Sequence, residues 1–244
     1  MLKRTVDIAL ACLLLIISLP ILAVAAVAIK IDSEGTVFFC QARMGRRFRR
    51  FALFKLRTMR IFVDGSAYTL GEDPRITRVG QWLRRTKVDE LPQLWNVLRG
   101  EMSMVGPRPV IPALAIEFRQ EYNRLLEVRP GLTDPATLKY CREVELLALV
   151  SDPLLYFKTV ITPDKLRISA AYLDRANLLS DLGVMASTAA ALLPRNGLPR
   201  FARKWSFGQV GEQQLAAELL SVAPVKNVEP QTMDDQGDCA IPAA

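Results

Sequence analysis

The sequence has no histidine and only four cysteines in 244 residues. The missing histidine excludes a Ser-His-Asp triad, histidine-ligated zinc and any imidazole acid or base. Cys12, Cys40, Cys141 and Cys239 lie far apart and form no CxxC pair, so neither a zinc ribbon nor a disulfide framework is expected. A reducing, cytosolic setting suits the polar part of the chain. Any catalysis would therefore use carboxylates, Lys, Tyr, Ser, Cys or a metal ion on oxygen ligands.

Acidic residues are outnumbered, because 32 Lys and Arg face 25 Asp and Glu for a net charge of +7. With 50% hydrophobic and 23% charged residues, the composition is that of one folded domain. Residues 43–60 hold eight Lys and Arg without one acid. Such a cluster can meet anionic lipids, nucleic acid or a phosphorylated substrate, unless it is only a solvated face. Since no recognition helix or RNP-like motif is present, we expect no nucleic-acid partner.

Charge is absent from Ile8 to Ile29, a run of 22 residues. As a helix this run would span about 33 Å, enough to cross the hydrocarbon core. Three interpretations are open: a cleaved signal peptide, a spanning helix, and a re-entrant hairpin bent at Pro20, which has no amide N–H. The basic cluster that follows resists export, which argues against the signal peptide. A hairpin would keep both basic ends on one side, but the residues alone do not decide between hairpin and span.

Two β-prone runs follow the apolar segment, at residues 36–42 and 48–56. Between them, residues 44–47 (Met-Gly-Arg-Arg) have the composition of a turn. The pattern predicts a β-hairpin that carries much of the basic cluster.

A short helix is predicted at 91–98, where Leu and Trp recur at helical spacing. Pro92 fits only its first turn, which places Asp89 at or near the N-cap. Asp89 can then be a simple capping residue. With Glu90 beside it and three cations at 84–87, it can equally belong to a site that handles phosphate, with or without a divalent ion.

Arg108 lies between Pro107 and Pro109 in a turn-rich stretch. The two prolines restrict the backbone, so the guanidinium would lose little entropy on binding an anion. The alternative is a surface arginine in a rigid loop.

Taken together, these motifs closely resemble the bacterial sugar transferases, the monotopic polyprenyl-phosphate phosphoglycosyltransferases that initiate exopolysaccharide, O-antigen and glycan assembly. The resemblance runs in unbroken order over residues 2–193. The segments that carry it are 54–59 (FKLRTM), 73–80 (DPRITRVG), 89–97 (DELPQLWNV), 102–109 (MSMVGPRP) and 128–133 (VRPGLT).

The resemblance implies transfer of a sugar-1-phosphate from a UDP-sugar to polyprenyl (undecaprenyl) phosphate, with release of UMP, at the inner face of the bacterial cytoplasmic membrane. It implies Mg²⁺ as cofactor and anionic membrane lipids as further partners, and a homo-oligomer is left open. A catalytically silent scaffold of a polysaccharide assembly complex is the alternative, because a site can persist after activity is lost.

The resemblance also assigns roles to individual residues. Asp89 would be the nucleophile that forms a phospho-sugar intermediate and a metal ligand, and Glu90 would assist proton transfer from the acceptor. Pro20 would break the membrane helix. The residues expected to bind substrate phosphate are Arg108, Arg84, Lys55, Arg57 and Arg75.

The expected fold is mainly α with a small β-hairpin, in a monotopic membrane protein with a cytoplasmic interfacial catalytic domain. We divide the chain into a re-entrant membrane helix (1–35), a catalytic domain (36–193) and a partly basic, then acidic and disordered tail (194–244). Lys87 and Asp134 depart from the usual family pattern, and we interpret them as subfamily variation. The apolar helix expected at 178–193 is assigned to packing or membrane contact.

Overall fold

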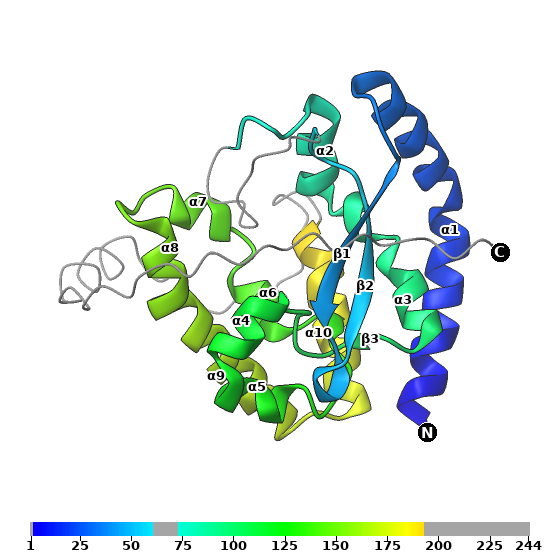
Figure 1. Cartoon of the computed structure of the whole chain (residues 1–244). Helices are drawn as coiled ribbons and strands as arrows, with labels where there is room; N and C mark the ends of the chain where they lie inside the picture. Colours follow the sequence, from blue (N-terminus) through cyan, green and yellow to red (C-terminus); the bar gives the residue numbers. More distant parts are fainter. Residues whose placement is uncertain (1, 61–72, 193–244) are drawn as a thin grey trace.

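The computed structural model describes residues 2–60 and 73–192 and is mainly helical (Figure 1). A long N-terminal helix runs along one side of the molecule, a β-hairpin lies in the middle, and most of the shorter helices lie on the far side (Figure 1). The predicted fold class, mainly α with a small hairpin, is confirmed. The expected tail at 194–244 lies outside the described residues.

Helix α1 (Leu2–Asp32) is continuous and contains Pro20 in its interior. Its two ends lie at opposite ends of the domain (Figure 1). Pro20 therefore does not divide α1 into two helices, as the predicted break would require. An apolar helix can accommodate the missing N–H without ending. Among the described residues, α1 is the one helix long and apolar enough to cross a membrane.

The hairpin pairs β1 (Phe38–Met44) with β2 (Arg50–Leu56) in antiparallel register, Phe38 opposite Leu56 and Met44 opposite Arg50. Its turn contains a 3₁₀ segment, η1 (Arg46–Phe48), in which Arg47 and Phe48 have positive φ angles of 56° and 58°. The hairpin prediction is confirmed, with each strand starting two residues later than expected.

A second, parallel sheet joins β3 (Ser103–Val105) to β4 (Gly131–Thr133). The strands can approach because both contacting positions are glycine: a Cβ on Gly131 would lie 2.1 Å from the amide nitrogen of Gly106. Strands of three residues are too short to show an alternating pattern, and the sequence analysis did not predict this sheet.

The remaining elements are short helices, and two of them match predictions: α3 lies at the helix expected at 91–98, and α10 at the one expected at 178–193. Their bounds are α2 Arg78–Thr86, η2 Val88–Glu90, α3 Gln93–Arg99, α4 Pro112–Glu117, α5 Arg119–Leu125, α6 Pro135–Lys139, α7 Glu143–Leu147, α8 Pro153–Tyr156, η3 Phe157–Ile161, α9 Thr162–Leu173 and α10 Leu178–Leu192.

The apolar core joins α1 to the domain at both ends of the helix. Near its N-terminus, Ala11 is fully buried against a cluster that includes Leu94 of α3. Near its C-terminus, Ala25 and Ile29 pack against Leu83 of α2 in a separate cluster. Burial of apolar surface at both ends holds the helix along the domain.

The opposite face of α1 remains apolar and exposed. Its exposed side chains are Leu13, Leu14, Ile16, Ile17, Leu19, Ile21, Val24, Val27 and Ile31. An exposed apolar face of this length is typical of a surface that meets a membrane or another protein.

Candidate active site

The two adjacent carboxylates lie in η2, between α2 and α3. Lys87 ends α2 in the left-handed conformation (φ 59°), and this reversal starts the 3₁₀ turn. As a result the side chains of Asp89 and Glu90 are both buried, with 6% and 9% of their surface exposed. Helix α3 then begins directly after Pro92.

Glu90 is surrounded by cations. Its Oε1 lies 2.6 Å from Nη2 of Arg108, 3.7 Å from Nζ of Lys87 and 4.0 Å from Nζ of Lys55. Burial alone would raise the pKa of Glu90, but the three cations outweigh it and hold the pKa well below its usual range. Glu90 is therefore a stable carboxylate that fixes the positions of the basic side chains.

Asp89 has the opposite environment. Its Oδ1 is buried and has no hydrogen-bond partner among the described residues. Burial, and then the neighbouring charge of Glu90, raise the pKa of Asp89, although nearby cations oppose the shift. Neither η2 nor α3 has a side-chain cap, so the capping interpretation is wrong. An unsatisfied buried carboxylate oxygen is a candidate to bind a cation or a ligand atom.

Lys55 comes from β2 and reaches the carboxylates from the hairpin side. Its side chain is 21% exposed. Burial lowers the pKa of Lys55 to about 8, and Glu90 opposes the shift. A substantial fraction of this ammonium loses its proton at mildly alkaline pH, which is unusual for a lysine.

Arg108 reaches Glu90 from the loop that follows β3. Two backbone hydrogen bonds fix this loop against β4: Gly106 N to Thr133 O at 3.1 Å, and Gly131 N to Pro107 O at 2.9 Å. The Glu90 carboxylate raises the pKa of Arg108. The Arg108 side chain is 39% exposed, so its guanidinium can also bind a ligand.

Arg84 and Arg75 have different surroundings. Nε of Arg84 donates to Oγ1 of Thr58 at 2.8 Å, and burial lowers its pKa while the charge of Asp89 opposes that shift. The guanidinium of Arg75 pairs with the carboxylate of Asp73, with Nε–Oδ1 at 2.9 Å and Nη2–Oδ2 at 2.6 Å. Arg84 is thus next to the dyad, whereas Arg75 is held by an acid of its own.

Arg57 has a different position from that expected. It is 4% exposed, and its guanidinium donates to the backbone carbonyls of Ser33 (2.8 Å) and Glu34, just after α1. These contacts join the end of the N-terminal helix to β2. The structure therefore does not bring Arg57 together with Glu90 as it does Lys55 and Arg108.

Two contacts were not predicted, although Lys87 had been counted among the cations that precede the dyad. Lys87 approaches Glu90 at a spacing of three residues, which is a usual spacing for an ion pair in a helical turn. Asp134, fully buried, caps α6 by accepting from Thr137 N at 2.7 Å, and it also accepts from Ser169 Oγ at 2.7 Å. The sequence Asp-Pro followed by Thr is a helix start signal that could have revealed this cap.

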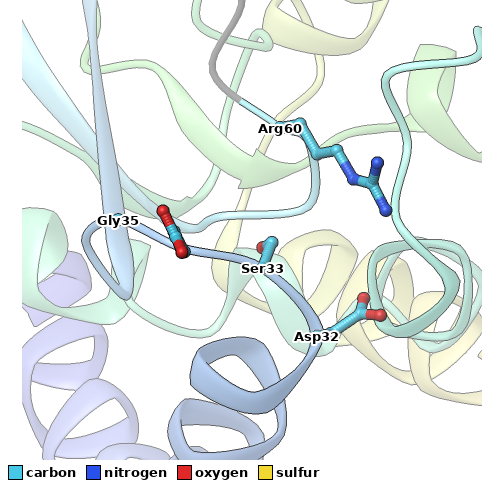
Figure 2. A pocket seen from close by; sticks show the side chains of 5 residues that line it. Asp32, Ser33, Gly35 and Arg60 are labelled. Atoms are coloured by element: carbon cyan, nitrogen blue, oxygen red, sulfur yellow. The ribbon is translucent and has the colours of Figure 1, made fainter.

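A polar cavity of about 520 Å³ lies away from the dyad, at the end of α1 (Figure 2). Arg60 extends over it toward Asp32, and Ser33, Glu34 and Gly35 complete its lining. None of the predicted site residues lines it.

The dyad suits a magnesium ion. Mg²⁺ is usually held by one or two carboxylates together with water and substrate phosphate oxygens. Asp89 supplies an unpartnered carboxylate oxygen and Glu90 lies next to it. The described residues contain no cluster of three or more acidic, His or Cys side chains that could hold a metal ion without a substrate. These residues fit an ion that binds together with a phosphorylated ligand.

The geometry combines a buried carboxylate that has an unpartnered oxygen with a set of cations. A carboxylate of this kind can attack phosphorus, and Lys and Arg around it can balance charge on phosphoryl oxygens. The cations are Lys55, Arg84, Lys87 and Arg108.

Comparisons with known proteins identify the family of this chain. The family model described as bacterial sugar transferase matches residues 1–195. A Komagataeibacter xylinus protein named undecaprenyl-phosphate glucose phosphotransferase is 41% identical over 70% of this chain and 33% of its own length.

Two further relatives are similar. The UDP-glucose:undecaprenyl-phosphate glucose-1-phosphate transferase of Caulobacter vibrioides is 43% identical over 57% of this chain and 54% of its own length. The exopolysaccharide production protein PSS of Rhizobium leguminosarum bv. phaseoli is 43% identical over 58% of this chain and 75% of its own length. The chain thus aligns with about a third, a half and three quarters of these relatives. It belongs to the bacterial sugar transferase family.

Proposed function

We propose that this protein transfers a sugar-1-phosphate from a UDP-sugar to undecaprenyl phosphate and releases UMP. The names of the relatives support the reaction class. The observation that carries the proposal is the buried Asp89 oxygen without a hydrogen-bond partner, next to Glu90 and its cations. The site would supply the attacking oxygen and the cations, and the substrate would supply the electrophilic phosphorus.

In the first step a carboxylate oxygen of Asp89 attacks the donor phosphorus that bears the sugar. The new Asp89–phosphorus bond forms as the bond from that phosphorus to the bridging oxygen breaks, and the electron pair leaves with UMP. Arg108 and Lys55 lie where they can bind the diphosphate oxygens and balance their charge.

In the second step a phosphate oxygen of the lipid acceptor attacks the same phosphorus and displaces Asp89. The product is a sugar linked to the lipid through a diphosphate, and the carboxylate is regenerated. Glu90 was expected to assist proton transfer from the acceptor, but its strongly lowered pKa makes it a weak base in the free protein. We assign it chiefly to holding Arg108, Lys55 and Lys87.

Magnesium would be held by Asp89, with Glu90 beside it, and by the donor phosphates. When bound, it would supply further positive charge for the phosphoryl oxygens.

We further propose a monotopic arrangement at the inner face of the cytoplasmic membrane. Both ends of α1 pack on the same domain, and the exposed apolar face between them can enter one leaflet. A helix that crossed the bilayer would carry its first turns away from that domain. A shallow insertion of this face agrees with these contacts and would bring the dyad to the lipid headgroups; a re-entrant bend at Pro20 would have to form in the membrane, because α1 is continuous here.

The test is to identify the nucleotide released from a panel of UDP-sugars by the detergent-solubilised protein with Mg²⁺ and undecaprenyl phosphate. We expect UMP with at least one donor. Release of UDP would indicate ordinary glycosyl transfer, and no release by a folded protein would favour the silent scaffold.

The matched variants are Asp89→Asn and Asp152→Asn, the latter a change in an aspartate that only caps α8 through Leu155 N. Asp89→Asn should lower turnover at least about a thousandfold because the nucleophile is lost, while Asp152→Asn should leave it unchanged. Near-normal turnover in Asp89→Asn would remove Asp89 from the mechanism.

A further inference from the structure

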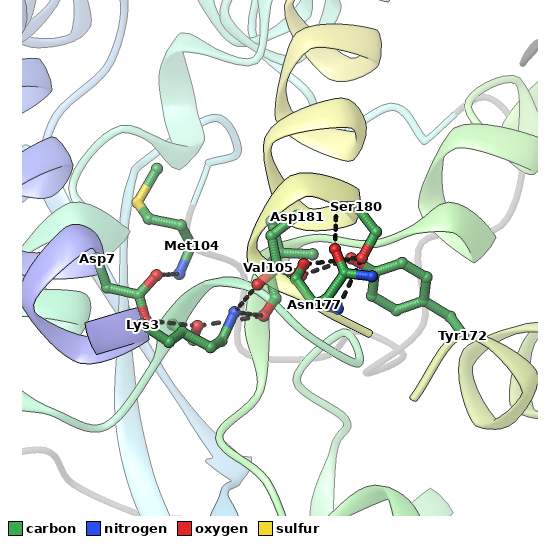
Figure 3. A network of polar contacts seen from close by, with 9 residues as sticks. Lys3, Asp7, Met104, Val105, Tyr172, Asn177, Ser180 and Asp181 are labelled. Carbon is green, nitrogen blue, oxygen red and sulfur yellow. Dashed lines mark hydrogen bonds and ion pairs between the residues drawn. The ribbon is translucent and has the colours of Figure 1, made fainter. Parts of the chain in front are cut away.

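Asp7 is a buried carboxylate in the second turn of the membrane helix α1. Only 5% of its surface is exposed. Its Oδ2 accepts a hydrogen bond from Ser103 Oγ at 2.7 Å, and its Oδ1 accepts from Met104 N at 3.3 Å (Figure 3). Both donors belong to β3. Since a carboxylate at this depth is costly without partners, its position depends on the strand.

Asp7 accepts a backbone hydrogen bond from β3 that a neighbouring strand would otherwise accept. On one edge, β3 pairs with β4 through Ser103 and Val105. The amide of Met104 is the one that Asp7 accepts, and Lys3 Nζ donates to the carbonyl of Val105 at 3.2 Å. All three residues of the strand are thus bonded to the first two turns of α1 (Figure 3).

Lys3 is itself held from a second direction. It forms an ion pair with Asp181 of α10, and Tyr172 OH donates to the other oxygen of Asp181 at 2.5 Å (Figure 3). Movement of Lys3 would therefore disturb contacts with α9 and α10. These contacts hold the first turns of α1 beside β3.

The strand continues directly into the loop that presents Arg108. Only Gly106 and Pro107 lie between Val105 and Arg108, and Gly106 packs so closely on the chain before β4 that a Cβ there would lie 2.6 Å from the carbonyl oxygen of Arg129. A displacement of β3 would therefore be passed on to the Arg108 guanidinium and its contact with Glu90.

We propose that Asp7 is a positioning residue that sets Arg108 through β3, so that docking of α1 completes the phosphate-binding site. The inference rests on the proposed function, in which Arg108 binds donor phosphate. It predicts that the membrane helix does more than anchor the protein: its first turns form part of the support of the site.

The kinetic test compares Asp7→Ala with Ser18→Ala. Ser18 is also a buried polar residue of α1, but its hydroxyl donates to Leu15 O within the same helix. We expect kcat/KM for the UDP-sugar to fall about 10- to 100-fold in Asp7→Ala, in line with loss of hydrogen bonds to a charged group, and to stay unchanged in Ser18→Ala.

A double-mutant cycle separates positioning from general stability. With Arg108→Ala already present, Asp7→Ala should add less than about a threefold further loss, because the group that it positions is gone. Losses that multiply in full would overturn the inference.

Hydrogen exchange of the vesicle-bound protein gives a readout that does not need activity. Exchange over 103–108 should be about tenfold faster in Asp7→Ala than in wild type or Ser18→Ala, with the α4–α9 helices unchanged. Asp7→Asn, which keeps an acceptor for Met104 N–H, should restore most of the protection. Unchanged exchange at 103–108, equal acceleration everywhere, or no rescue by Asn would each overturn the inference. If wild type released no nucleotide, only the proposed function would fail, and the exchange result would still decide the role of Asp7.

Discussion

The buried carboxylates of this protein fall into two regions with opposite hydrogen bonding. Around β3 and α6, Asp7 and Asp134 accept bonds from backbone amides and hydroxyls on both oxygens. In η2, Asp89 is buried to a similar degree, but one of its oxygens has no partner among the described residues. The first region uses burial to fix backbone positions, whereas the second keeps a charged oxygen available.

Two adjacent carboxylates can differ in the same way, as Glu90 and Asp89 show. It is adjacent to Asp89 in sequence, yet Arg108, Lys55 and Lys87 all approach Glu90. The pKa of one carboxylate is lowered and that of its neighbour is raised. When two adjacent acids have different environments, one can have a structural role while the other takes part in the chemistry.

Neutralising one acid in each region should have opposite effects on stability. Besides stopping turnover, Asp89→Asn should raise the free energy of unfolding at neutral pH, by up to about 1 kcal/mol, because a poorly solvated charge is removed. Asp134→Ala should lower it by about 2–4 kcal/mol, since a helix cap is lost and Ser169 is left without its acceptor. Chemical denaturation at several pH values would measure both.

The sign of the pH effect follows from the raised pKa of Asp89. The folded state binds this proton more tightly than the unfolded state, so the cost of the charge is present at neutral pH and disappears as pH falls through the folded pKa. The advantage of Asp89→Asn over wild type should therefore shrink on acidification. A loss of stability in Asp89→Asn at pH 7 would mean that the carboxylate is satisfied after all.

A smaller effect, about tenfold per pH unit, is expected from Lys55. Its pKa of about 8 means that the cation is lost as pH rises through this value, so kcat/KM for the donor should decline above pH 8. Lys55→Arg keeps the charge and should move this decline to higher pH. An unchanged decline in Lys55→Arg would assign the titration to another group.

Elements with a local sequence pattern could be predicted. Apolar spacing predicted α3, and two β-prone runs around a Gly-containing turn predicted the hairpin. The position before Pro92 left Asp89 open as a cap or as part of a phosphate site, and only the family resemblance assigned the dyad; the structure puts Asp89 inside a 3₁₀ turn. Single-residue backbone reversals such as that at Lys87 have no sequence pattern of their own when the residue is not glycine.

Contacts between residues far apart in the sequence could not be predicted from local patterns. The pairing of β3 with β4 joins strands of three residues, and it depends on the close approach of Gly106 and Gly131. The Asp7 contact with β3 joins positions 96 and 97 residues apart. Nothing in the local composition distinguishes a lysine such as Lys55, which faces the dyad, from an arginine two residues later on the same hairpin that faces α1.

That arginine gives the smallest expected effect on catalysis. Arg57→Met should lower the free energy of unfolding by about 2–4 kcal/mol, because the carbonyls of Ser33 and Glu34 lose their donor, but should change KM for the UDP-sugar by less than about twofold. Lys55→Met is the matched change on the substrate side of the hairpin, and it should raise KM at least about tenfold with a smaller effect on stability. Thermal unfolding and donor kinetics on the two variants would test the division. A large rise in KM for Arg57→Met at unchanged stability would restore the phosphate-binding role of Arg57 that was predicted from the sequence.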